Sequence, residues 1–522
     1  MKEFLRAFNL GVFEKDLSGE QKELVRNLLN IGAISAHKGK LYLNDGYVFG
    51  RLDIARDGTG YLQSFDDRFK ADLIIENRYL SGVHLGDLIL AKILSSKKSR
   101  LHAKVLMCVK PAFLTSVVYT KSFGREILGV NVKTGLANPL KATQKSLKQL
   151  PANTLLKIDN LTNEITEVIG SLADPFVDEK ISLAIYDKND EFNEACKQQA
   201  ASFGSEVDEA LYPQRVNLQY LPFCTIDPID AKDFDDAIYF DVKERTLYVA
   251  IADVSEYVSE YSPIDKEAKF RGFSIYFPHR SVPMLPRELS ENICSLMPDL
   301  PRLAFVFKIA LDENLNPQKQ ELFEAIIRSK RRYNYDEVDE ILRTRKACES
   351  EILNWLLPLN EICERLRRAR LKRGFDFRTK ELRITLDERG LISSTRFETD
   401  TPSHKLIEDC MLLANKAAAA RIERGVFRNH GSAELKKIYA LLDDLALFGI
   451  DAPYQSNLAK MIGEIQAQAG TMGIREEVDK LIIKAQKRAE YASESRGHFG
   501  LGFDNYTHFT SPIRRYSDLI LH

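Results

Sequence analysis

The sequence contains few cysteines and no long apolar segment. Seven cysteines occur among 522 residues, and no two of them form a Cys-x-x-Cys pair. This scarcity argues against a zinc ribbon or a disulfide framework and fits a reducing compartment, so we expect a cytoplasmic protein. No run of about 18 apolar residues is present, so no membrane-spanning helix is expected. The N-terminal residues lack an apolar core followed by a cleavage site, and no secretory signal is predicted.

An excess of charge of either sign is also missing. Lys and Arg total 74, Asp and Glu total 75, and the formal net charge is -1. A nucleic-acid partner therefore does not follow from bulk charge, and any basic surface must be local. Hydrophobic residues make up 44% and charged residues 29%, an ordinary globular balance. A chain of this length predicts several domains.

The sequence pattern predicts a small winged-helix-like element over residues 1–45. Apolar residues recur at helical spacing over residues 19–34, and a short hairpin closed by Asn44-Asp45-Gly46 follows. An N-terminal decoration without a binding role is an equally good interpretation of this pattern.

The sequence pattern predicts two small β-barrels of the cold-shock-like OB type, over residues 46–110 and 111–170. Short strands alternate with turn residues in both segments, less regularly in the second. In the first barrel, Tyr61 follows the sequence DGTG, and an aromatic on the open face of such a barrel could stack on single-stranded bases. A strand-rich segment with one aromatic can equally be plain core. Basic residues that could attract phosphates follow the last strand: Lys97, Lys98 and Arg100.

Residues 171–522 predict a large mixed α/β domain, because strands now alternate with long helices. Its most informative segment is CTIDPIDAKDFDDAIYF, residues 224–240, in which five aspartates lie between two apolar strands. So many like charges in such a place are unfavourable unless a cation neutralises them. Carboxylates without neighbouring Cys or His favour Mg²⁺, with Mn²⁺ as a second choice, over zinc.

A metal at this loop would suit phosphodiester hydrolysis, because Mg²⁺ usually shares its coordination between protein, water and substrate phosphate. The alternative is a solvated acidic turn, which the strongly apolar flanking strands disfavour. A calcium-binding EF-hand loop fails because Ala237 and Ile238 occupy positions that need an oxygen ligand and a turning glycine.

The segment TIDPIDAKDFDDA, residues 225–237, closely resembles the signature of the ribonuclease II/R family, also called RNB. The similarity spans nearly all of residues 221–522, and the two upstream barrels match the cold-shock pair that precedes this catalytic domain. The bacterial ribonuclease R branch is closest in pattern. Further segments agree in order: IADVSEYV (251–258), VPMLPRELSENICSL (282–296), RRYNYDEV (331–338), HKLIEDCMLLAN (404–415), FRNH (427–430) and YTHFTSPIRRYSDL (506–519).

The resemblance implies a processive 3′→5′ exoribonuclease that hydrolyses single-stranded RNA to nucleoside 5′-monophosphates. Asp227, Asp233 and Asp236 would hold Mg²⁺ together with Asp235, the aspartate most critical to hydrolysis. Arg514 would contact the scissile phosphate, since a guanidinium can bind two phosphate oxygens.

The resemblance also implies residues that contact RNA. Tyr276 resembles the aromatic that stacks on the last base, and Phe377 would form the opposing side, with core packing as the alternative for both. Tyr335 and Glu408 resemble residues that contact the terminal ribose, where hydrogen bonds to the 2′-OH would favour RNA over DNA. For Glu408, a structural salt bridge is the competing explanation. We predict structural roles for His498 and His508.

Two other functions remain in view, a catalytically silent RNA-binding regulator and a DNA exonuclease. The intact aspartates and Arg514 disfavour the first, and Tyr335 with Glu408 disfavours the second. Family members normally continue past SPIRRYSDLI with more helix and a further OB barrel, and the sequence does not tell whether the chain is truncated after His522. It also does not reveal duplex unwinding, the end-product length, target transcripts, helicase or ribosome-associated partners, or the oligomeric state.

Overall fold

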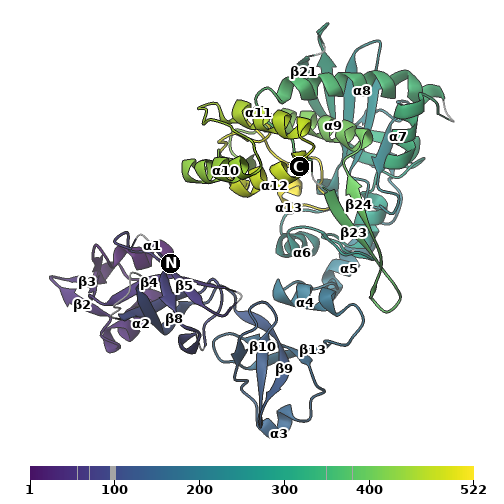
Figure 1. The fold of residues 1–522 in the computed structure, drawn as a ribbon. Coiled ribbons are helices and arrows are strands. Elements are labelled where there is room, and N and C mark those ends of the chain that lie inside the picture. Colours follow the sequence, from purple (N-terminus) through teal and green to yellow (C-terminus); the bar gives the residue numbers. More distant parts are fainter. Residues whose placement is uncertain are drawn as a thin grey trace. The chain divides into compact units, whose positions relative to one another are not determined.

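The computed structural model describes residues 1–55, 57–69, 71–80, 82–94, 101–314, 316–347, 350–378 and 380–522. Lys97, Lys98 and Arg100 lie outside this part. By internal packing, the chain divides into two compact units. One unit comprises Met1–Asn189 with Glu388–Leu391, and the other comprises Asp190–Asp387 with Ile392–His522. Figure 1 shows the elements of both.

The first unit begins with two helices and a three-stranded antiparallel sheet of order β1-β3-β2. The second helix starts at Ser18, because the Ser18 hydroxyl accepts the Gln21 backbone N–H while the Gln21 side chain accepts the N–H of Ser18. Leu28 of this helix packs in one core with Phe49 and Leu90 of the following barrel. The N-terminal element therefore shares a core with the barrel. Its elements are α1 (Lys2–Ala7), β1 (Val12–Phe13), η1 (Glu14–Asp16), α2 (Gly19–Asn30), β2 (Ile34–His37) and β3 (Lys40–Leu43).

A closed five-stranded barrel follows, with neighbours in the order β4-β5-β6-β8-β7. Leu52 and Leu62 are opposite each other on β4 and β5 and point into the barrel core, so the alternation of apolar residues closes the sheet around them. The predicted OB-type barrel is confirmed. Its elements are β4 (Tyr47–Ile54), β5 (Gly60–Ser64), β6 (Leu73–Ile75), η2 (Asn77–Tyr79), β7 (Leu88–Leu94) and β8 (His102–Lys110).

The second module is an open five-stranded antiparallel sheet of order β11-β10-β9-β12-β13 around Val118, Leu156 and Ile158. Helix α4 (Val177–Ile185) packs against β9 and β13. Residues 171–189 therefore group with the first unit, whereas the sequence placed them in the catalytic domain. The other elements are β9 (Thr115–Phe123), β10 (Glu126–Asn131), β11 (Ala137–Asn138), α3 (Gln144–Leu147), β12 (Thr154–Asp159) and β13 (Ile165–Ser171).

The second unit is built on a seven-stranded mixed sheet of order β14-β21-β20-β17-β16-β15-β22. Both faces of its central strands are apolar, so that Ala237 belongs to one core and Ile238 to another. The first core also contains residues of α5 and α6, and the second contains residues of α7, α8 and α9. The strands are β14 (Val216–Asn217), β15 (Cys224–Asp227), β16 (Asp236–Asp241), β17 (Thr246–Ala252), β20 (Pro301–Leu311), β21 (Pro317–Arg328) and β22 (Arg331–Asn334).

Helices and short strands surround this sheet. Helices α10, α11 and α12 form a separate small core of their own. No helix in the described ranges combines the length and the apolar character needed to cross a bilayer. The helices are α5 (Glu194–Ala201), η3 (Glu209–Leu211), η4 (Val254–Glu256), α6 (Pro263–Arg271), η5 (Leu289–Ile293), α7 (Tyr335–Thr344), α8 (Ser350–Arg370), α9 (Pro402–Ala419), α10 (Leu435–Leu447), α11 (Leu458–Thr471), α12 (Arg475–Ala485) and α13 (Tyr516–Leu519). The short strands are β18 (Ile275–Tyr276), β19 (Ser281–Val282), β23 (Lys380–Leu386), β24 (Ile392–Thr399), β25 (Phe427–Asn429) and β26 (Glu490–Ala492).

Candidate active site

The acidic segment connects two neighbouring strands of the central sheet. Strand β15 ends at Asp227 and β16 begins at Asp236, and the two strands pair antiparallel through Cys224 and Ile238. The intervening loop therefore returns on itself and brings both ends of the segment to the same edge of the sheet. Apolar residues hold the strands in place, so the carboxylates gather where the strands end.

Four of the five aspartates are at least half-buried, and the fifth, Asp230, is exposed. Burial, and after it the neighbouring charges of Asp236, Asp235 and Asp233 in that order, raise the pKa of Asp227 to about 8. Burial also raises the pKa of Asp235 to about 8 and that of Asp236 to about 6. These four carboxylates therefore form one cluster of like charge that the protein neutralises only in part.

Arg514 reaches this cluster from the C-terminal segment. Its Nε donates to Oδ2 of Asp235 at 3.2 Å, and the backbone N–H of Ile513 donates to Oδ1 of the same carboxylate at 2.8 Å. Nη2 of Arg514 donates to Oγ of Ser511 at 2.9 Å. The backbone N–H of Ser511 in turn donates to the fully buried Asp518 at 2.9 Å. This chain of hydrogen bonds fixes the guanidinium beside Asp235.

Tyr276 also contacts the cluster, through Asp233. Its hydroxyl donates to Oδ2 of Asp233 at 2.7 Å, while 54% of the residue remains exposed. The hydrogen bond holds the ring by its polar end and leaves apolar surface accessible. This arrangement is compatible with stacking on a base.

Tyr335 and Glu408 lie on the helices that cover the sheet. Tyr335 is the first residue of α7, directly after β22, and its ring stacks on that of His404 with centroids 3.8 Å apart. Glu408 is exposed on α9. A salt bridge on this helix is made by the next residue, Asp409, which accepts from Nη2 of Arg367 at 2.7 Å.

Phe377 and Tyr61, the two remaining residues predicted to contact RNA, have neighbours outside the carboxylate cluster. Phe377 meets Phe375 edge to face with centroids 5.3 Å apart, and it packs against the core of α10, α11 and α12. These contacts are those of core packing, the alternative considered for this residue. Tyr61 belongs to the first unit, where it is half-buried on β5 opposite Asp53 of β4.

Sequence reasoning missed two residues that hold the acidic loop. Nη2 of Arg332, on β22, donates to the carbonyl oxygens of Pro228 and Ile229, at 2.6 Å in each case. Oγ of Ser295 accepts the backbone N–H of Phe234 at 3.0 Å and donates to the carbonyl oxygen of Lys232 at 2.8 Å. Both residues lie in segments that resemble the family, RRYNYDEV and VPMLPRELSENICSL, but their side-chain roles depend on contacts distant in sequence.

The carboxylates fit a hard divalent ion that binds few protein ligands. Within the described ranges, no three His, Cys, Asp or Glu side chains are arranged closely enough to hold a metal ion. Asp227 nevertheless has a buried Oδ2 without a hydrogen-bond partner, whereas both oxygens of Asp235 are already engaged. An ion here would use Asp227 with Asp236 and complete its shell with water and phosphate, as Mg²⁺ ordinarily does.

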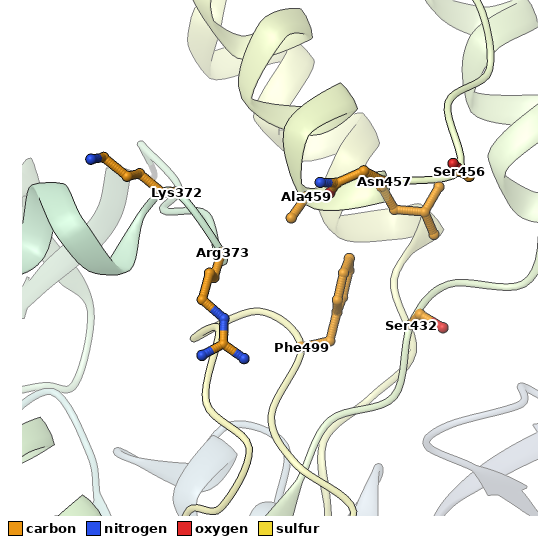
Figure 2. A pocket seen from close by; sticks show the side chains of 8 residues that line it. Lys372, Arg373, Ser432, Ser456, Asn457, Ala459 and Phe499 are labelled. Atoms are coloured by element: carbon orange, nitrogen blue, oxygen red, sulfur yellow. The ribbon is translucent and has the colours of Figure 1, made fainter.

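A surface cleft of about 380 Å³ lies at the start of α11, and none of the predicted site residues lines it (Figure 2). The ring of Phe499 stands in the middle of this cleft, below the first turn of α11. The guanidinium of Arg373 is paired with Asp504 at 2.6 Å. The lining residues are Lys372, Arg373, Ser432, Ser456, Asn457, Leu458, Ala459 and Phe499.

Comparison with known proteins assigns the fold to a family. The RNB domain matches residues 215–522, more than half of the chain. The chain belongs to the RNB family. The resemblance found in the sequence is thus confirmed, and the two N-terminal modules of this RNB protein match the first and second OB domains of ribonuclease R over residues 3–104 and 117–183.

Individual RNB relatives are similar over most of their length. Ribonuclease R of Helicobacter pylori (strain ATCC 700392 / 26695) is 36% identical over 534 aligned residues, which cover 100% of this chain and 81% of that protein. Ribonuclease R of Escherichia coli (strain K12) is 31% identical, covering 92% and 61% respectively. The solved structure of Mycoplasma genitalium RNase R in complex with ribose methylated single-stranded RNA superposes with a TM-score of 0.79 at 28% identity, covering 91% of this chain and 78% of that one.

Proposed function

We propose that this 3′→5′ exoribonuclease of the RNB family hydrolyses single-stranded RNA at the carboxylate cluster of Asp227, Asp233, Asp235 and Asp236, with Mg²⁺ as its cofactor. The observation that carries the proposal is the pairing of Arg514 with Asp235 inside a cluster of half-buried carboxylates. An acidic patch alone, or an arginine alone, would not indicate a site of phosphodiester hydrolysis. A guanidinium held within a group of carboxylates provides one place for a cation and an adjacent place for a phosphate.

In this proposal, Asp227 and Asp236 hold the ion, and Asp235 orients Arg514 and the water that attacks the phosphate. Mg²⁺, when bound, supplies charge for the phosphate oxygens and makes the attacking water a stronger nucleophile. Arg514 uses Nε for Asp235 and Nη2 for Ser511, which leaves other N–H donors of its planar group for the scissile phosphate. Asp233 holds the hydroxyl of Tyr276 and so links the metal site to the base-stacking ring.

Recognition of the RNA end follows from three further residues. Tyr276 stacks on the last base without reading sequence, because every base has a π-face. Tyr335 and Glu408 contact the terminal ribose, where a hydrogen bond to the 2′-OH separates RNA from DNA. Support for single-stranded RNA as the substrate comes from the Mycoplasma genitalium relative, whose structure contains it. Phe377 is a secondary candidate for the opposing side of the base that Tyr276 stacks on, and Tyr61 is a secondary candidate for stacking on single-stranded bases at the first barrel.

We also propose that the enzyme acts in the cytoplasm. Five of the six described cysteines are buried, as expected of thiols in a reducing compartment. A catalytically silent RNA-binding regulator with the same fold is the second candidate. It is disfavoured because all four aspartates and Arg514 are present.

One assay separates these candidates. The protein is incubated with Mg²⁺ and either RNA or DNA strands labelled at the 5′ end, and the assay is repeated with Asp235→Asn. We expect stepwise shortening of RNA from the 3′ end, release of nucleoside 5′-monophosphates, intact DNA, and RNA binding without cleavage by the variant. Intact RNA with the unmodified protein would favour the silent regulator, and loss of DNA would favour a DNA exonuclease.

A further inference from the structure

Arg332 connects a neighbouring strand to the loop that carries the aspartates. Strand β22 runs parallel to β15, with Arg332 beside Thr225 and Asn334 beside Asp227. From this position, Nη2 of Arg332 reaches over the end of β15 and donates to the carbonyl oxygens of Pro228 and Ile229, at 2.6 Å each. One nitrogen therefore holds two consecutive peptide groups immediately after Asp227.

Few other interactions stabilise the turn at residues 228–231 of this loop. Ile229 is 73% exposed, and Asp230 is exposed as well, so side-chain burial does not anchor the turn. A backbone hydrogen bond from the N–H of Ala231 to the carbonyl oxygen of Pro228, 3.0 Å long, closes it. The carboxylates on either side of the turn repel one another, and this repulsion would open the turn. The hydrogen bonds of Arg332 to the loop backbone oppose that opening.

The guanidinium also contacts the far end of the loop. It lies over the ring of Phe234 at 5.1 Å from the centroid, a distance typical of a cation–π contact. Phe234 is only 5% exposed, and the hydroxyl of Ser295 accepts its backbone N–H. Arg332 thus bridges residues 228–229 and residue 234, which enclose Asp233 and precede Asp235 and Asp236.

We propose that Arg332 is a positioning residue that holds the acidic loop in its ion-binding shape before a divalent cation binds, and so determines affinity for the cation. Its hydrogen bonds go to carbonyl oxygens of the loop backbone. The inference rests on the proposed function for the identity of the cation site. Substitution of residues that orient metal ligands typically lowers metal affinity about 10- to 100-fold.

The first test measures cation binding without hydrolysis. Mn²⁺, a spectroscopically visible substitute for Mg²⁺, is titrated into the full chain, and bound Mn²⁺ is followed by electron paramagnetic resonance. Arg332→Met, which keeps the apolar stem near Phe234, is expected to weaken Mn²⁺ binding about tenfold. Arg332→Lys is expected to lose less, because an ammonium keeps donors and charge but not the planar stack.

The matched control is Arg331→Met on the same strand. Arg331 lies over the ring of Tyr333 at 4.6 Å and pairs with Glu337 at 3.5 Å, so its removal changes net charge equally while the hydrogen bonds of Arg332 to Pro228 and Ile229 remain. We expect Mn²⁺ affinity within about twofold of the unmodified protein, below the effect expected for a residue that orients ligands. Equal losses in the two Met variants would overturn the proposal in favour of a general charge effect.

The second test asks whether the loop itself loosens. Amide hydrogen exchange at Ala231 is expected to speed up in Arg332→Met, while β16 keeps its protection and the variant keeps its unfolding temperature within a few degrees. Unchanged affinity and exchange in that variant would overturn the inference. Failure of the unmodified protein to bind Mn²⁺ would instead contradict the proposed metal site, so the two failures are distinguishable.

Discussion

Nε of Arg514 lies 3.2 Å from Oδ2 of Asp235, although 279 positions of sequence separate the two residues. The carboxylate is almost fully buried, and the arginine is about half exposed. One side of the guanidinium therefore holds a buried carboxyl group by a hydrogen bond while the rest of it stays accessible. The pair belongs to the proposed site and also contributes to packing, so substitutions of its two members should have different consequences.

Asp235→Asn should abolish hydrolysis and leave the fold at least as stable as before. Burial raises the pKa of Asp235 to about 8, so the folded protein favours the neutral side chain, which asparagine mimics. Thermal unfolding at pH 8 without divalent ions should show an equal or higher midpoint for the variant. A variant that hydrolyses RNA at the normal rate would contradict the catalytic role of Asp235.

Arg514→Ala should lower kcat about 100- to 1000-fold, the usual effect of removing one group that stabilises charge in a transition state. It should also destabilise the protein, because Asp235 then remains buried without its partner. Breaking a fully buried ion pair costs roughly 3–5 kcal/mol of unfolding free energy. The loss in Arg514→Ala should be smaller, since Arg514 is half exposed.

The double variant Asp235→Asn with Arg514→Ala provides the control for this interpretation. If the stability loss comes from the uncompensated carboxylate, the double variant should be more stable than Arg514→Ala alone, as measured by urea denaturation. Strictly additive effects would show that the two side chains do not depend on each other.

Tyr276 allows its ring and its hydroxyl to be tested separately. Tyr276→Phe removes only the hydrogen bond to Asp233 and should change RNA affinity little. Tyr276→Ala also removes the stacking surface and should cost about 1–3 kcal/mol of binding free energy. Fluorescence anisotropy with short RNA in the inactive Asp235→Asn background measures both, and equal effects of the two substitutions would refute a stacking role.

The protein should lose stability in acid because two histidines, His498 and His508, are held neutral in the fold. Burial lowers the pKa of each from 6.5 to about 4, so the folded state keeps both rings neutral. Below pH 6.5 the unfolded chain takes up protons first. The contribution of the two rings to stability is therefore fully present above pH 6.5 and declines as the pH falls toward 4, by roughly 3 kcal/mol at most for each ring.

Urea denaturation between pH 7 and pH 4.5 with Mg²⁺ present measures this decline. A variant with glutamine at both histidine positions should show a smaller slope over the same interval, even if it is less stable at pH 7. An unchanged slope would locate the acid sensitivity elsewhere.

Much of the carboxylate site could be predicted from the sequence because its information is local. Asp227 and Asp236 flank a loop between two apolar strands, and this pattern is visible without coordinates. The first barrel was predictable for the same reason, since its strands alternate in hydrophobicity and are separated by turn residues. The contact between Arg514 and Asp235 was accessible only through resemblance, because nothing in the sequence measures a distance across 279 residues.

Other features depend on pairings that no local pattern specifies. The role of Arg332 requires the parallel register of β15 and β22, and the role of Ser295 requires a loop from another part of the fold. Phe377 was grouped with the RNA contacts by resemblance, whereas its neighbours place it on the small core of α10, α11 and α12. The packing of α4 on β9 and β13 is a tertiary contact that the local sequence pattern does not specify.

The apolar character of both faces of β15 and β16 has an evolutionary consequence. Residues such as Ala237 and Ile238 maintain the scaffold, whereas the acids of the proposed site lie at the strand ends and repel one another. Loss of one of those acids is therefore expected to lower turnover and to relieve part of this repulsion, while the two apolar cores remain. The sheet can therefore persist in a protein that binds RNA without cleaving it, because the residues that build its cores are not the residues of the proposed site.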